Sequence, residues 1–107
     1  MAKKTFDKLL IEAIDEVFST LGDSAKQSIY FHLRTKFSVA KNDIPEHIED
    51  FENGLGKIFG TGSKFLEILI MKKLYEKVGQ TLELNESTNL VFVDYVAAAK
   101  RRFSKNN

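Results

Sequence analysis

Apolar residues recur every three or four positions near the start of the chain, which places them along one face of an α-helix. The residues on this face are Phe6, Leu9, Leu10, Ala13, Ile14, Val17, Phe18 and Leu21. The pattern predicts an amphipathic helix that has to cover a core. Gly22 follows it, and glycine often ends a helix because it adopts the left-handed conformation without a steric penalty.

A second helix is predicted over residues 25–36. Ser24 and Gln27 have the spacing of a capping box at its start. Its middle, residues 29–33, is apolar or aromatic in every direction, because five consecutive helical residues cover the whole circumference. Such a helix lies either at the centre of a bundle or under a partner.

Two further helices are predicted in the middle of the chain. Pro45 marks the start of one, since proline is tolerated in a first helical turn. Gly54 and Gly56 lie inside its pattern and would permit close packing or a kink. After a break at residues 60–63, apolar side chains surround most of the next helix, which makes the helix from Phe65 to Val78 the central one.

The last part of the chain has two interpretations. Residues 81–84 alternate like a short strand, and residues 90–93 could pair with them as a hairpin. The helical spacing of Phe92, Val96, Ala99 and Phe103 instead favours a fifth helix from about Leu90 to Phe103, capped near Asn89, with a frayed tail behind it.

These elements predict an all-α fold, a compact orthogonal bundle of about five helices. At 107 residues the chain is long enough for one domain with a single core. We expect this domain to span residues 1–107, with an ordered core over about 5–103 and short basic or polar termini.

Residues that could carry chemistry are scarce. There is no cysteine, which excludes disulfides, thiolate metal sites and cysteine nucleophiles. His32 and His47 have no companions at ligand spacing, and adjacent carboxylates such as Asp15 and Glu16 diverge around a helix. The sequence therefore predicts no enzyme and no catalytic, metal or cofactor site.

A glycine-rich run covers residues 54–64. It lacks the spacing of a phosphate-binding loop, and no strand precedes it. A helix stop followed by a cap explains it better than a phosphate site at residues 61–64. No small-molecule substrate is expected.

Charge is balanced overall, with 16 basic and 15 acidic residues, which argues against a general polyanion binder. The layout is uneven, because residues 42–56 hold only acidic charges and residues 100–105 only basic ones. We predict a protein-interaction or regulatory module that forms a homodimer or docks onto another protein. The alternative is a nucleic-acid-binding accessory protein that uses the basic C-terminus. The candidate interaction surface consists of Tyr30, Phe31, Lys100, Arg101 and Arg102.

Apolar runs such as residues 68–71 are far too short to span a membrane. Asp7, Lys8 and Glu12 interrupt any signal-peptide pattern behind the basic N-terminus. No membrane contact is expected, and a cytoplasmic location is predicted.

The order of several turn and core segments resembles a small archaeal family described as a Nitrosopumilus-type output domain. The segments that carry the resemblance are residues 21–24, 29–33, 44–45, Phe51, 58–60, Gly62 and 66–67. The resemblance covers about residues 6–78. It implies an all-helical archaeal domain, sometimes joined to sensory or regulatory modules, with no established catalytic residues.

Overall fold

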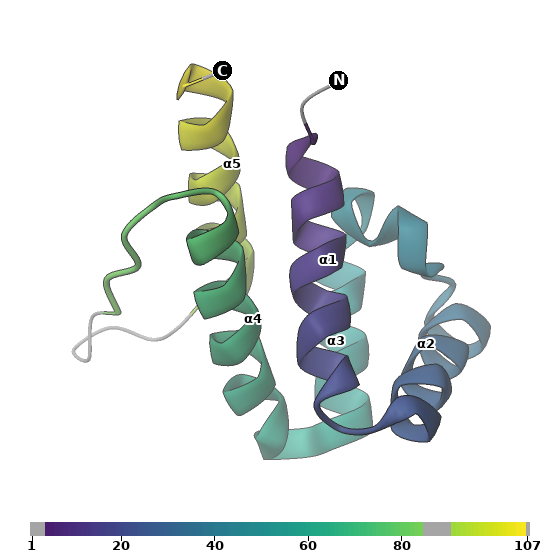
Figure 1. Cartoon of the computed structure of the whole chain (residues 1–107). Coiled ribbons are helices and arrows are strands. Elements are labelled where there is room, and N and C mark those ends of the chain that lie inside the picture. Colours follow the sequence, from purple (N-terminus) through teal and green to yellow (C-terminus); the bar gives the residue numbers. More distant parts are fainter. Residues whose placement is uncertain (1–3, 85–90, 107) are drawn as a thin grey trace.

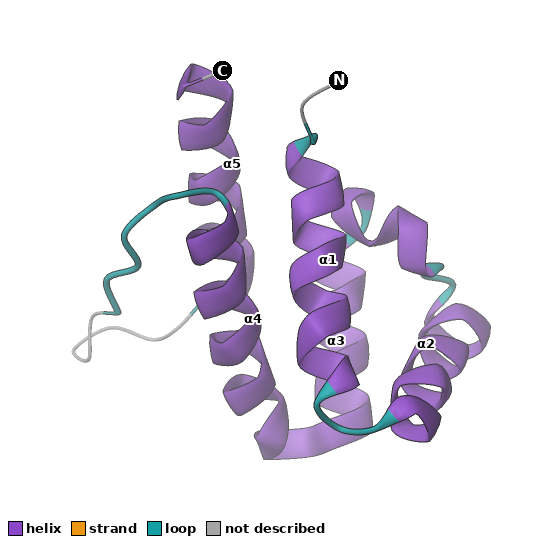
Figure 2. Cartoon of the chain, in the orientation of Figure 1, coloured by secondary structure: helices purple, strands orange, loops and turns teal. Residues whose placement is uncertain are grey.

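Helices make up the regular structure of the computed structural model, which describes residues 4–84 and 91–106 (Figure 1). They are α1 (Phe6–Ser19), α2 (Asp23–Phe37), the 3-10 helix η1 (Lys41–Glu46), α3 (Ile48–Phe59), the 3-10 helix η2 (Gly60–Gly62), α4 (Ser63–Lys77) and α5 (Phe92–Asn106). No strand occurs in these ranges (Figure 2). The predicted all-α bundle is therefore confirmed.

The first helix forms as its pattern predicts. Thr5 caps α1, because its side-chain oxygen accepts a hydrogen bond from the backbone N–H of Lys8 at 3.2 Å. The buried face of the helix consists of Phe6, Leu10, Ala13, Ile14, Val17 and Phe18. The apolar spacing thus identified the face that covers the core.

The start of α2 differs from the prediction. The helix begins at Asp23, directly after Gly22, whose φ of +100° makes the sharp turn from α1. Ser24 therefore lies inside the first turn, and no side chain caps the helix. The predicted capping box of Ser24 and Gln27 is wrong because a glycine backbone conformation makes this turn.

The predicted helix start at Pro45 is also wrong. Pro45 lies inside η1, and α3 begins only at Ile48. Ile44 is fully buried in the core, and the backbone N–H of His47 donates to its carbonyl oxygen at 3.0 Å. A hydrogen bond between residues three apart is typical of a 3-10 helix, which is wound more tightly than an α-helix. The 3-10 helix η1 ends before α3 begins.

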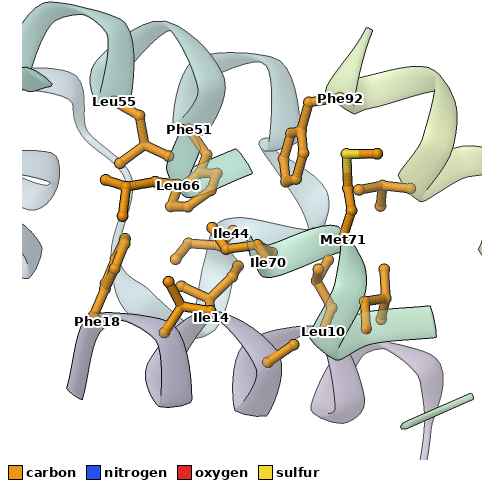
Figure 3. Close-up of a cluster of buried hydrophobic side chains, with 14 of the residues drawn as sticks. Leu10, Ile14, Phe18, Ile44, Phe51, Leu55, Leu66, Ile70, Met71 and Phe92 are labelled. Atoms are coloured by element: carbon orange, nitrogen blue, oxygen red, sulfur yellow. The ribbon is translucent and has the colours of Figure 1, made fainter. Parts of the chain in front are cut away.

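The core lies around α4, as predicted for the helix from Phe65 to Val78. α4 packs against α1, α3 and α5. In Figure 3 its Leu66, Ile70 and Met71 lie among side chains of the neighbouring elements. The buried residues labelled there from those elements are Leu10, Ile14, Phe18, Ile44, Phe51, Leu55 and Phe92.

Close approach of α2 and α3 depends on one glycine. A Cβ atom at Gly54 would lie 2.7 Å from Cδ2 of Leu33 and 3.3 Å from Cδ2 of Phe37. The same atom at Gly56 would have nothing within 4 Å. Of the two expected roles, close packing or a kink, Gly54 has the first.

The end of the chain is helical and not a hairpin in the described residues. Residues 81–84 lie in a loop, and α5 begins at Phe92. The expected start at Leu90 and cap near Asn89 fall outside the described residues. The helix continues beyond Phe103 to Asn106, where the sequence predicts a frayed tail.

Candidate interaction surfaces

Tyr30, the first candidate residue, is used largely within the fold. Its hydroxyl donates to Oδ1 of Asp15 at 3.0 Å, and its ring meets Phe18 edge-on at a centroid distance of 5.5 Å. Burial, together with the hydrogen bond to Asp15, raises the pKa of the Tyr30 hydroxyl. Half-buried and held in this way, the side chain links α2 to α1.

Phe31 faces the solvent, with 53% of its surface exposed. The guanidinium carbon of Arg34, one turn later, lies 5.9 Å from the centroid of its ring. This distance is within the range of a cation–π contact. Phe31 is therefore an available apolar side chain, but one that already has a cation beside it.

Lys100, Arg101 and Arg102 are exposed on α5. In Figure 1, α5 and α2 lie on opposite sides of the molecule. The candidate surface thus separates into an aromatic part on α2 and a basic part on α5, and one flat partner could not cover both.

The start of α1 and the end of α5 lie at the same end of the bundle (Figure 1). The rings of Phe6 and Phe103 lie 5.9 Å apart. Lys4 is paired with Glu12 at 2.9 Å. Within the described residues, the cations without an ion pair near these ends are Lys8, Lys100, Arg101, Arg102 and Lys105. We call these five residues the basic end.

A groove of about 240 Å³ lies between α1 and α4. Its lining consists of Val17, Thr20, Leu69, Glu16, Lys72, Lys73 and Glu76. Phe65 precedes Leu69 by one helical turn and therefore lies on the same side of α4. With 66% of its surface exposed, Phe65 is the most exposed large apolar residue among those described. No aromatic ring or cation stacks on it in the described part of the chain.

Phe65 was not predicted from the sequence as an interaction residue. Its position at the start of a nearly all-apolar helical stretch predicted a central helix and did not show which side remains uncovered. The structure shows that the covered sides of α4 face α1, α3 and α5.

Carboxylates on α1 are paired with lysines from several other elements. Lys26 of α2 and Lys41 of η1 reach Asp15 at 3.4 and 2.9 Å. Lys77 of α4 pairs with both Glu12 and Glu16. Burial opposes ionisation of Asp15, but hydrogen bonds from Lys41 and Tyr30 outweigh it and lower the pKa of its carboxyl group. These pairs hold elements together, and Glu12, Asp15 and Glu16 each already have a cation.

Glu67 of α4 is a buried acid, with only 1% of its surface exposed. Its Oε1 accepts no hydrogen bond from the described residues, although Nζ of Lys64 lies 3.6 Å away. Burial raises the pKa of this carboxyl group; Lys64 opposes the shift, and the charge of Glu52 adds to it. Burial of Glu67 was not predicted from the sequence, since glutamate is almost never fully buried unless it is paired.

Neither a metal site nor a membrane span is found in the described ranges. Among residues 4–84 and 91–106, no three histidine, aspartate or glutamate side chains gather closely enough to hold a metal ion. In the same ranges, every helix is too short or too polar to cross a membrane.

Comparison with protein-family models, curated proteins and solved structures found no match to this chain. The resemblance to the archaeal output-domain family therefore stays a prediction. Function has to be inferred from the surfaces that the chain itself presents.

Proposed function

We propose that the chain is a protein-interaction module that docks through Phe65 and the groove between α1 and α4. The observation that carries the proposal is the 66% exposure of a phenylalanine one turn from this groove. Aromatic residues seated in pockets supply much of the energy of protein interfaces. The groove rim carries Glu76 as well as Lys72 and Lys73, so it suits a partner with both charges, such as a second copy.

A signalling or regulatory output role is one form of this function, in which binding transmits a signal to the partner protein. A cytoplasmic location fits such a module, since a chain without cysteine suits a reducing compartment. The archaeal resemblance supports the same view. No reaction is required of the chain.

Substituting Phe65 tests the docking surface. We expect the wild-type chain to self-associate at micromolar concentration, and Phe65→Ser to weaken this association about tenfold, because an apolar anchor is removed. Phe31→Ser is the matched control, because it removes an exposed phenylalanine from α2 and should leave the association unchanged. Light scattering across a concentration series measures both.

A wild-type chain that stays monomeric excludes the homodimer. The docking proposal then requires that a partner bound by the wild type fails to bind Phe65→Ser. Equal binding of that partner by both proteins contradicts the proposal.

Nucleic-acid binding is a second candidate, supported by the gathering of basic residues from α1 and α5 at the basic end. Such binding would release counterions, so its affinity would fall steeply with salt. Arg101→Gln combined with Lys105→Gln should reduce the slope of log affinity against log salt by about one unit for each phosphate that is no longer neutralised. Gel retardation of DNA and RNA at low salt measures this, and no retardation of either rules the candidate out.

A further inference from the structure

A cleft of about 560 Å³ lies between α5 and the loop that follows α4. Its lining residues are Tyr75, Gln80, Thr81, Glu83, Asp94, Tyr95, Ala98 and Arg102. This volume falls within the range of about 300–1,000 Å³ that is typical of ligand sites. The cleft lies apart from the groove of the proposed docking surface and shares no lining residue with it.

Two hydrogen bonds fix the loop beside α5. Nε2 of Gln80 donates to the carbonyl oxygen of Ala99 at 3.0 Å, and the hydroxyl of Tyr95 donates to the carbonyl oxygen of Glu83 at 3.4 Å. Gln80 thus contacts Ala99, and Glu83 contacts Tyr95, which lies one helical turn earlier in α5. Residues 80–83 therefore run antiparallel to the helix, and these two segments form walls of the cleft.

Gln80 is fixed in this wall by its own hydrogen bonds. Its backbone N–H donates to the carbonyl oxygen of Tyr75 at 2.9 Å, and its side-chain amide is committed to Ala99. The remaining atom, Oε1, is buried and receives no hydrogen bond from the described residues. Because this oxygen has almost no accessible surface, a ligand in the cleft does not reach it, and the role of Gln80 is to hold the loop against α5.

Opposite charges stand at the two ends of the cleft. Asp94, Ala98 and Arg102 follow one another at four-residue intervals, which places them along one side of α5. At 1.5 Å per residue, the first and last are separated by about 12 Å along the helix. Glu83 lies at the Asp94 end, because Tyr95 binds its carbonyl oxygen. Neither Asp94 nor Arg102 has an ion-pair partner in the described part of the chain.

We propose that this cleft binds a short peptide in extended form, with its terminal ammonium group at Asp94 and its terminal carboxylate at Arg102. Three extended residues span about 10 Å, which matches the separation of the charges. Arginine binds carboxylates through two parallel hydrogen bonds. No small-molecule substrate was expected from the sequence, and the residues that line the cleft form no recognisable sequence motif.

Titration of the full chain with triglycine, monitored by two-dimensional NMR, tests the proposal. Triglycine should shift the signals of Gln80, Ala98 and Arg102 with a dissociation constant in the millimolar range or below. Its amide, which lacks the carboxylate, and its N-acetyl form, which lacks the ammonium group, should each bind about tenfold more weakly. Glycine is too short to reach both charges and should bind weakly as well.

Arg102→Gln should lower triglycine affinity about tenfold and abolish the difference between triglycine and its amide. Arg101→Gln is the matched control, because its exposed guanidinium lies on the same helix but outside the lining, and it should bind like the wild type. Equal weakening in the two variants would reveal general anion attraction and overturn the proposal. The absence of shifts at these residues with 10-fold excess over about 1 mM protein overturns it as well.

Discussion

Replacing Gly54 with valine is expected to destabilise the protein by about 3 kcal/mol, the upper end of the usual penalty for overpacking a core. A Cβ atom at this position would already lie 2.7 Å from Cδ2 of Leu33 and 3.3 Å from Cδ2 of Phe37. Leu33 is itself fully buried, so its side chain cannot turn aside freely. The added atoms would force α2 and α3 apart. Urea denaturation measures the change.

Gly56→Val is the matched control for this prediction. It makes the same change two residues later in the same helix, where a Cβ atom meets nothing within 4 Å. We expect the free energy of unfolding to stay within about 0.5 kcal/mol of the wild type, since valine is accepted in a helix somewhat better than glycine. Equal destabilisation of the two variants would show that backbone propensity, and not the approach of α2, sets the effect.

Replacing Glu67 with glutamine is expected to stabilise the protein at pH 7 by about 2 kcal/mol, because it removes a buried charge whose one cation, Lys64, is largely exposed and lies beyond hydrogen-bond distance. For a domain of this size, that corresponds to a rise of about 10 °C in melting temperature. The side chain is 1% exposed, and its Oε1 accepts no hydrogen bond from the described residues. Glutamine keeps the shape and removes the charge.

The same carboxyl group sets a pH dependence with a definite sign. Because the pKa of Glu67 is raised by folding, the folded protein binds a proton at pH values where the unfolded chain does not. Stability should therefore increase as pH falls from 7 towards the ordinary glutamate pKa of about 4.3. The pKa of Asp15 is lowered instead, so its stabilising effect is lost as pH falls below about 4.

Melting temperatures between pH 7 and pH 5 test this sign. Glu67→Gln should flatten the curve across this window. Glu76→Gln, which neutralises an exposed glutamate on the same helix, should leave the slope unchanged. A wild-type slope of the opposite sign, or the same slope in Glu67→Gln, contradicts the assignment.

The helices were predictable where one side of the pattern is apolar and the other polar. α1 satisfies this condition, and its buried face is the predicted one. Boundaries were less predictable, because they depend on backbone conformations that side-chain patterns do not encode. The positive φ of Gly22 moved the start of α2, and the burial of Ile44 accompanies a 3-10 turn where an α-helix was expected.

The surfaces could be predicted only in part. Charge counting identified the basic stretch of α5, but the contact between Phe6 and Phe103 that brings the start of α1 beside α5 joins residues far apart in sequence. Hydrophobicity could not distinguish exposed Phe65 from buried Leu66 beside it, since both belong to an apolar stretch. Likewise, Gln80 is fixed by a hydrogen bond to α5 that only tertiary structure reveals.

The partners of α1 also bear on how the chain is made. Its carboxylates pair with lysines as distant as Lys77, and its most extensive packing is against α4. The ribosome synthesises α1 before α4. The apolar side and the acidic side chains of α1 therefore lack their partners on α4 until α4 has been made. Packing of α4 against α1 covers the exposed apolar side of α1. Nascent chains stalled before residue 77 would therefore be the ones that most need a chaperone.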